Sequence, residues 1–123
     1  IIANGLKALA MDLGIAVVLL SQMSRKADEH YGRPSMTHLR DSGAIEAAAD
    51  QVALLFTDHA HPLSKREPAF AGYSELEIVA HRNGPQALVP LNFNGNCQQI
   101  TDWEGAQPSR TAIAKPASRG MPT

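Results

Sequence analysis

The stretch Leu13-Gly14-Ile15-Ala16-Val17-Val18-Leu19-Leu20 decides which fold this chain is expected to adopt. Before it, apolar residues recur at helical spacing from Leu6 to Leu13, and Gly14 is typical of the residue that follows the end of a helix. The apolar run over residues 15–20 then predicts a strand that is buried on both faces. Because such strands occur mostly in parallel sheets covered by helices, we expect an α/β fold with a mostly parallel sheet.

The segments downstream predict a second helix and a second buried strand. Residues 21–37 are polar and too long for an ordinary connection, and such loops are usually functional or disordered. Residues 44–49 are helix-prone, with Asp41 or Ser42 as the natural N-terminal cap. Residues 51–56 form another continuous apolar run, so we expect a second strand that is buried on both faces.

A hairpin with an arginine at its turn is expected near residue 82. Residues 74–82 and 87–94 flank Asn83-Gly84, a dipeptide typical of a turn with positive φ at both central residues. Arg82 would then lie at a rigid strand end, where its guanidinium suits an anionic ligand such as a phosphate. The alternative is a surface arginine beside a hairpin. Residues 98–103 are the candidate for an added edge strand.

Composition and charge bound the domain organisation. The chain has 123 residues with a net charge of −1 and 44% hydrophobic residues, which fits one domain with a modest core. No apolar run approaches the about 18 residues that a membrane-spanning helix needs, and a single Cys97 fits a reducing cytoplasm. Residues 105–123 are basic and rich in Ala, Pro and Ser. We therefore expect a folded domain over residues 1–104 and a disordered tail over residues 105–123.

Two further positions are candidates for ligand contacts. Gln22 follows the first expected strand, and ligands of open α/β sheets bind outside the carboxyl ends of strands. The alternative for Gln22 is a polar residue that caps a neighbour. Arg40, Asp41 and Gly43 precede the second expected helix, where free N–H groups, a cation and close backbone approach suit a nucleic-acid phosphate. An ordinary capped helix start with a solvated arginine fits equally well.

A metal site is not expected. His59 and His61 could both be ligands, but the sequence has no matching pair of cysteines or acids at ligand spacing. We therefore interpret residues 58–72 as a solvated loop. The sequence also has no G-x-x-x-x-G-K-[ST] phosphate loop and no acid-ended apolar strand upstream to hold Mg²⁺. We expect a fragment of a longer protein, because a nucleotide site cannot be completed from this chain alone.

Several of these segments together resemble the C-terminal, RecA-like motor domain of the DnaB-type replicative DNA helicases. The resemblance covers roughly residues 5–104, in the order and spacing of the family. The matching segments are Leu6-Lys7-Ala8-Leu9-Ala10, Val17-Val18-Leu19-Leu20-Ser21-Gln22, Arg33-Pro34, Leu39-Arg40-Asp41-Ser42-Gly43-Ala44-Ile45-Glu46, Ala49-Asp50, Arg82-Asn83-Gly84-Pro85 and Leu91-Asn92-Phe93-Asn94-Gly95.

The resemblance implies the C-terminal part of a RecA-like P-loop NTPase core with a mostly parallel sheet and a terminal hairpin. It implies a homo-hexameric ring that uses ATP and Mg²⁺ to translocate on single-stranded DNA, with primase and a helicase loader as partners. Gln22 matches the strand-end glutamine that couples the γ-phosphate to the DNA-facing loop. Arg40, Asp41 and Gly43 match that loop. Arg82 matches the arginine finger, which acts in trans on the nucleotide of the neighbouring subunit.

One departure from the family pattern lies beside Arg82. The family usually has a lysine two residues before the finger, and this sequence has Ala80 there. Two alternatives to a helicase motor therefore stay open. The chain could be a non-catalytic remnant that binds DNA or docks on a helicase ring, or it could belong to another RecA-like ATPase, such as a recombinase.

Overall fold

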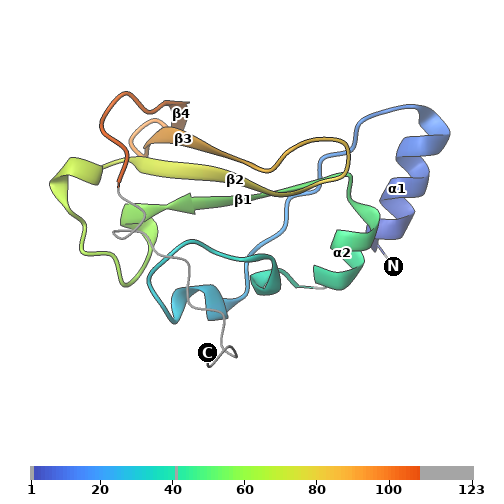
Figure 1. The fold of residues 1–123 in the computed structure, drawn as a ribbon, viewed down its shortest axis with the longest axis horizontal. Coiled ribbons are helices and arrows are strands. Elements are labelled where there is room, and N and C mark those ends of the chain that lie inside the picture. Colours follow the sequence, from blue (N-terminus) through green and yellow to red (C-terminus); the bar gives the residue numbers. More distant parts are fainter. Residues whose placement is uncertain (1, 41, 109–123) are drawn as a thin grey trace.

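The computed structural model describes residues 2–40 and 42–108, which form two helices and one sheet (Figure 1). The helices are α1 (Ile2–Leu13) and α2 (Ser42–Ala48). The strands are β1 (Gln51–Thr57), β2 (Tyr73–His81), β3 (Ala87–Asn94) and β4 (Gln99–Asp102). Short 3₁₀ helices lie in the connections, namely η1 (Arg25–Asp28), η2 (Met36–His38), η3 (Asp58–Ala60) and η4 (Pro68–Phe70).

The sheet is antiparallel, so the expectation of a mostly parallel sheet is wrong for the described part of the chain. Its strand order is β1-β2-β3-β4, and every neighbouring pair runs antiparallel. The connections from β2 to β3 and from β3 to β4 are short, whereas parallel pairing needs a crossover of a dozen or more residues. The longer connection from β1 to β2 also brings the chain back antiparallel to β1. The order is therefore that of a meander rather than of a wound α/β sheet.

β1 also differs from its prediction, because only one of its faces is buried. Val52, Leu54 and Phe56 are buried, whereas Ala53 and Leu55 are exposed. This alternation is normal for a strand of an antiparallel sheet with one face on the core. A continuous apolar run therefore did not distinguish a strand covered on one face from a strand covered on both.

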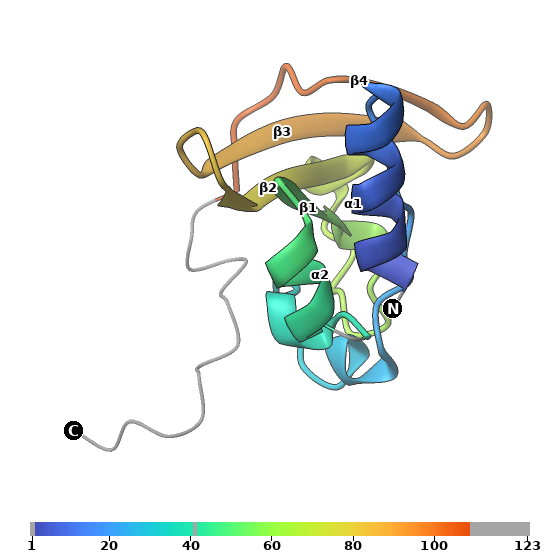
Figure 2. The same cartoon turned by 90° about the vertical axis from the view of Figure 1, so that its right-hand side faces the viewer.

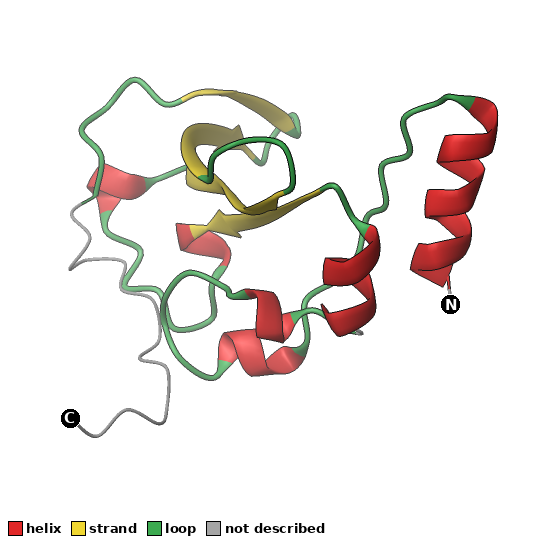
Figure 3. Ribbon diagram, turned by 45° about the vertical axis from the view of Figure 1, so that its right-hand side comes forward, coloured by secondary structure: helices red, strands yellow, loops and turns green. Residues whose placement is uncertain are grey.

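The apolar run that led to the parallel prediction does not form a strand at all. Residues 15–22 have no regular structure, and the side chains of residues 15–20 are exposed, with Leu20 at 88%. Figure 3 shows this segment as the connection between α1 and the rest of the chain. A strand buried on both faces needs paired neighbours and covering elements, and the described residues place neither beside it.

The hairpin is confirmed in its strands and corrected in its turn. β2 and β3 pair from Tyr73 with Asn92 to Ile78 with Ala87. Among the described residues the glycines with positive φ are 14, 32 and 72, so Asn83-Gly84 is not the two-residue turn that was expected. Instead the backbone of Arg82 leaves β2 and bonds to Asp50, and the chain needs a longer connection to return to β3.

Local helix and edge-strand predictions are confirmed. α1 ends at Leu13, and Gly14 follows it with φ of +62°. α2 covers most of the expected helix over residues 44–49, and β4 is the expected edge strand. The predicted disordered tail lies outside the described residues from residue 109 onward. None of the described helices is long and apolar enough to cross a membrane.

Two clusters of buried side chains form the core beneath the sheet. The first holds Leu39, Val52 and Leu54. The second holds Phe56 and Tyr73, against which Tyr31, Phe70 and Trp103 pack. Both clusters include side chains from the loop over residues 23–39, so they hold this loop against the sheet. Fully burying one such side chain contributes about 1.5–3 kcal/mol. A bridge between Met23 and Leu39 closes the base of that loop.

Candidate functional site

Arg82 lies where β2 ends and is held against the C-terminal end of α2. Its backbone N–H donates to the carbonyl oxygen of Asp50 at 2.8 Å. Its guanidinium donates through Nη1 to Oδ1 of Asp50 at 3.2 Å and through Nη2 to the carbonyl oxygen of Ala47 at 3.0 Å. The side chain is still 47% exposed. The structure thus places an arginine at a fixed strand end, although contacts with α2 and Asp50 fix it and not the tight turn that was expected.

Asp50 joins Arg82 to α1 as well. The ammonium of Lys7 donates to Oδ1 of Asp50 at 2.6 Å and to Oδ2 at 2.7 Å. The hydrogen bond from Lys7 and the positive charges of Lys7 and Arg82 hold the pKa of the Asp50 carboxyl below its ordinary value. Figure 1 and Figure 2 show α1 and α2 at the same end of the sheet. The ion pairs of Asp50 with Lys7 and Arg82 lie there.

The expected DNA loop lies at the other end of α2. Arg40 is exposed in a turn before the helix, and Gly43 is exposed in its first turn. Apart from its chain neighbours and the backbone of its own helix, no atom of the described residues lies within 4 Å of the position that a Cβ of Gly43 would occupy. Packing within this chain therefore gives no reason for a glycine here. Asp41 lies outside the described residues. At about 1.5 Å per residue, α2 separates this loop from Arg82 by roughly 10 Å.

The third candidate, Gln22, does not lie at the end of a strand. It is exposed and lies in the irregular segment that follows α1, one residue before the bridge from Met23 to Leu39. Gln22 was expected at the carboxyl end of a strand, and no strand forms at residues 15–20. Its predicted role thus stays a prediction, because the strand that would aim it is not formed.

A buried ion pair that the sequence did not predict fastens the loop before Arg40. Nε and Nη2 of Arg33 lie 2.5 and 2.8 Å from the two carboxylate oxygens of Glu75 in β2. The phenol of Tyr73 donates to Oε1 of the same carboxylate at 2.7 Å. Glu75 is 1% exposed and Arg33 11%, and burial together with the hydrogen bond to Glu75 raises the pKa of Tyr73. In the sequence, alternation places Glu75 within a strand but does not indicate that its face is covered.

A second buried carboxylate, Asp58, anchors the start of the connection from β1 to β2. The phenol of Tyr31 and the hydroxyl of Ser64 both donate to Asp58. Burial, followed by the contact with Asp58, raises the pKa of Tyr31. His61 is buried beside them and contacts the carbonyl oxygen of Ala27. The interpretation of this segment as a solvated loop is therefore wrong at Asp58 and His61.

The described residues do not build a metal site. No group of three His, Cys, Asp or Glu side chains within residues 2–40 and 42–108 is arranged to hold a metal ion. His59 and His61 contact separate partners, the carbonyl oxygens of Glu67 and Ala27. The described residues thus do not fit an Mg²⁺ centre.

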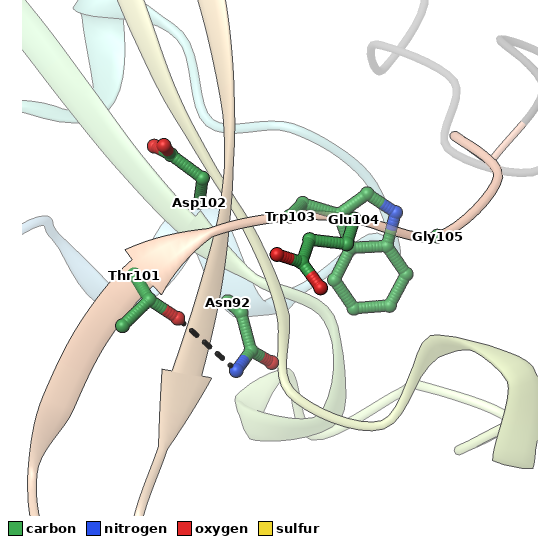
Figure 4. Close-up of a pocket in the computed structure, with 6 residues that line it drawn as sticks. All are labelled: Asn92, Thr101, Asp102, Trp103, Glu104 and Gly105. Atoms are coloured by element: carbon green, nitrogen blue, oxygen red, sulfur yellow. Dashed lines mark hydrogen bonds between the residues drawn. The ribbon is translucent and has the colours of Figure 1, made fainter.

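A shallow depression lies at the other end of the sheet, beside β4 (Figure 4). The amide of Asn92 donates to the hydroxyl of Thr101 at 3.4 Å across its floor. Trp103 forms one wall, and its ring packs edge-on against Tyr73 at a centroid distance of 4.9 Å. Because the indole N–H already donates to the carbonyl oxygen of Ala106, Trp103 serves packing at the sheet edge.

Comparison with known proteins defines the class of this chain. Residues 1–102 match the family described as DnaB-like helicase C terminal domain. The replicative DNA helicase DnaB of Leifsonia xyli is 35% identical over 101 residues, which are 81% of this chain and 21% of that protein. The DnaB of Geobacillus stearothermophilus is 39% identical over 93 residues, which are 75% of this chain and 20% of that protein.

Solved structures agree with that class. One structure, described as an ATPase domain, superposes with a TM-score of 0.74 at 32% identity, covering 84% of this chain and 36% of that one. A DnaB-like replicative helicase, solved in a study of its interactions with primase, gives a TM-score of 0.73 at 31% identity, covering 84% of this chain and 25% of that one.

The chain belongs to the DnaB-like helicase C-terminal domain family. It spans about a fifth of the length of the curated relatives that it matches. Those relatives are replicative DNA helicases, so the resemblance expected from the sequence is confirmed at the level of the family.

Proposed function

We propose that this chain is the C-terminal part of the RecA-like motor domain of a hexameric, cytoplasmic replicative DNA helicase. The whole enzyme would couple hydrolysis of ATP with Mg²⁺ to translocation on single-stranded DNA and unwinding of the duplex. Primase and a helicase loader would be its protein partners. Membership of the family over residues 1–102 supports this proposal, as does the likeness to a solved ATPase domain.

The observation that carries the proposal is the placement of Arg82. It is a half-exposed guanidinium at the end of a sheet strand, held at two of its nitrogen atoms. A charge held in this way suits a transition state in which negative charge develops on a phosphoryl group. Arg82 would thus be the arginine finger that this subunit contributes in trans to the nucleotide of its neighbour.

The loop before α2 would contact the DNA backbone. Arg40 supplies an exposed cation, and the open space at Gly43 lets a phosphate approach the backbone. Asp41 belongs to the same loop by its place in the sequence. Gln22 would report the state of the γ-phosphate to this loop, which requires that residues 15–20 form a strand in the assembled motor domain.

Replacing Arg82 by alanine in the full helicase tests the proposal. Hydrolysis should fall by about 10³–10⁵-fold, because a finger stabilises charge that is present only in the transition state. Binding of the nucleotide should change little, as measured by equilibrium titration with a fluorescent ATP analogue. The control is Arg25→Ala, which removes an exposed arginine in η1 and should leave both quantities unchanged.

Mixed rings test whether Arg82 acts across the subunit boundary. Subunits with Arg82→Ala are combined with subunits that lack the phosphate-loop lysine. Activity should partly return, since some interfaces then join an intact finger to an intact nucleotide site. Rings that stay inactive at every mixing ratio contradict the action in trans.

Arg40→Ala in the assembled ring tests the DNA contact. Affinity for single-stranded DNA should fall alike for all sequences, and the slope of log K against log salt should decrease by roughly 0.7 for one lost phosphate contact. Fluorescence anisotropy over a salt series measures both. An unchanged slope would mean that Arg40 is only a solvated surface residue.

A second candidate function is a non-catalytic subunit that binds DNA or docks on a helicase ring. Ala80 favours it, because the family usually has a lysine there and this side chain instead packs against the cluster of Leu39, Val52 and Leu54. A hydrolysis assay of the full protein separates the two candidates. If the full protein shows no turnover above background, the non-catalytic candidate holds.

A further inference from the structure

The contacts of Arg82 point to a role for Asp50 that the comparisons do not assign. We propose that Asp50 is the positioning residue of the arginine finger and that Lys7 offsets its negative charge. This inference rests on the proposed function of Arg82. Asp50 lies two residues after the end of α2, and it binds Arg82 at two points, with its carbonyl oxygen on the backbone N–H and with its carboxylate on Nη1.

The number of donors on the guanidinium allows Arg82 to be held and to act at the same time. A guanidinium carries five N–H groups. The contacts with Asp50 and Ala47 use one on Nη1 and one on Nη2, and the side chain remains 47% exposed. As far as the contacts of the described residues go, three N–H groups therefore remain for an anion. This arrangement orients the guanidinium and leaves donors available. In an inactive orientation, all of its N–H groups would donate to acceptors of its own subunit.

Fixing the guanidinium of Arg82 in advance matters, because ordering a free arginine side chain costs conformational entropy. It carries about 2 kcal/mol of rotamer entropy, which a finger must lose when it meets the phosphate. Two anchors on α2 and Asp50 remove much of that freedom before the neighbouring subunit presents its nucleotide. Such preorganisation lowers the barrier of the chemical step more than it changes the affinity for nucleotide.

Lys7 offsets the negative charge that Asp50 places beside Arg82. A carboxylate beside a phosphate-binding arginine would repel the phosphate. The ammonium of Lys7 lies 2.6 and 2.7 Å from the two carboxylate oxygens, so the group of Lys7, Asp50 and Arg82 keeps a net charge of +1. Lys7 reaches Asp50 from α1. The cationic character of the site thus depends on a helix far away in the sequence.

The first test measures positioning directly, in the 123-residue chain. Asp50→Asn keeps the size of the side chain and removes its charge. The ¹⁵N order parameter at Nε of Arg82 should fall. The midpoint temperature of thermal unfolding should not change, because the ion pair between Asp50 and Arg82 is exposed. Asp12→Asn, an exposed acid of α1, is the matched control and should leave the order parameter unchanged. An unchanged order parameter in Asp50→Asn overturns the inference.

The second test measures turnover in the full helicase. Asp50→Asn should lower kcat about tenfold with KM for nucleotide nearly unchanged, because it misplaces a group that acts in the transition state. Asp50→Glu should restore part of the lost turnover. If Arg82→Ala lowers hydrolysis but Asp50→Asn does not, positioning by Asp50 is wrong and the finger stands. If Arg82→Ala itself has no effect, the proposed function fails. A loss of nucleotide affinity equal to the loss of kcat would also overturn the inference, because it would mean general damage to the interface.

Discussion

Two regions of the described chain differ in how they bury their apolar residues. Residues 2–22 bury no side chain, although they contain the most apolar stretch of the sequence. The sheet region from β1 onward buries apolar side chains such as Leu54 and also the carboxylates of Asp58 and Glu75. Burial of a segment therefore depends on the elements that pack against it and not on its hydrophobicity alone.

The same contrast separates the contacts of the two regions. The sheet region is joined to the loop over residues 23–39 by a buried ion pair between Arg33 and Glu75 and by two apolar clusters. The N-terminal helix is held by an exposed ion pair from Lys7 to Asp50. Exposed ion pairs contribute at most about 1 kcal/mol, so the docking of α1 should add little to the stability of the sheet region. The sheet region itself should unfold as one cooperative unit. Four predictions test this comparison.

The largest loss of stability is expected from Glu75→Gln. The substitution keeps the shape of the side chain but removes the carboxylate charge that the 11%-exposed guanidinium of Arg33 contacts. Breaking a buried pair in this way costs about 3–5 kcal/mol, a large part of the stability of a small domain. Urea denaturation of the chain measures it. Glu46→Gln, at an exposed position of α2, should shift the free energy of unfolding by less than about 0.5 kcal/mol. Equal effects of the two substitutions would contradict the burial of the pair.

The next effect compares two leucines directly. Leu54→Ala removes a side chain that is 2% exposed, and it should lower the free energy of unfolding by about 2–5 kcal/mol. Leu20→Ala removes a side chain that is 88% exposed, and it should change that free energy by less than about 0.5 kcal/mol. The chemistry of the two substitutions is identical, so only burial distinguishes them. A comparable loss at Leu20 would show that residues 15–20 are packed in this chain.

A smaller loss is expected from Tyr73→Phe. The phenyl ring keeps its packing against Trp103, but Glu75 loses a hydrogen bond of 2.7 Å. A hydrogen bond to a charged group is worth about 1.5–3 kcal/mol. Because the two donors of Arg33 remain on the carboxylate, the loss should be less than that of Glu75→Gln. Denaturation of the single and double variants measures it. Additive losses in the double variant would mean that Tyr73 and Glu75 act independently.

The sequence predicted local structure well and partners poorly. Gly14 ends α1 because the helix end needs a residue at positive φ, a requirement that is visible in the residue itself. The alternating runs of β2 and β3 are likewise local. The direction of the sheet is not local, because it depends on which strand lies beside β1. The run over residues 15–20 suits a strand, but the described residues supply no neighbour for it.

The candidate site shows the same division. Arg82 and the loop before α2 were found because an arginine at a turn and a glycine at a helix start are local signals. The role inferred for Asp50 was not found, because its contacts come from Lys7 and Arg82, which are 43 and 32 residues away in the chain. Long-range polar contacts leave no periodic pattern in a sequence, so only the fold reveals them.

The smallest effect is expected at the contact that joins the two regions. Lys7→Met keeps most of the apolar stem and removes the ammonium from Asp50. In the folded chain Lys7 and Arg82 lower the pKa of Asp50, so their contact stabilises the fold above the ordinary carboxyl pKa of about 3.9 and is lost as the pH falls through the lowered value. Lys7→Met should raise the pKa of Asp50 toward its ordinary value while leaving the sheet intact, because the contact is exposed and β1–β4 do not depend on it. An NMR titration of the carboxyl carbon measures the pKa, and Lys65→Met, at an exposed position of the loop after β1, is the control that should not move it. Should the pKa of Asp50 stay unchanged in Lys7→Met, α1 is not docked through this pair. Should β1–β4 unfold, α1 is part of the cooperative unit and the division of the chain into two regions is wrong.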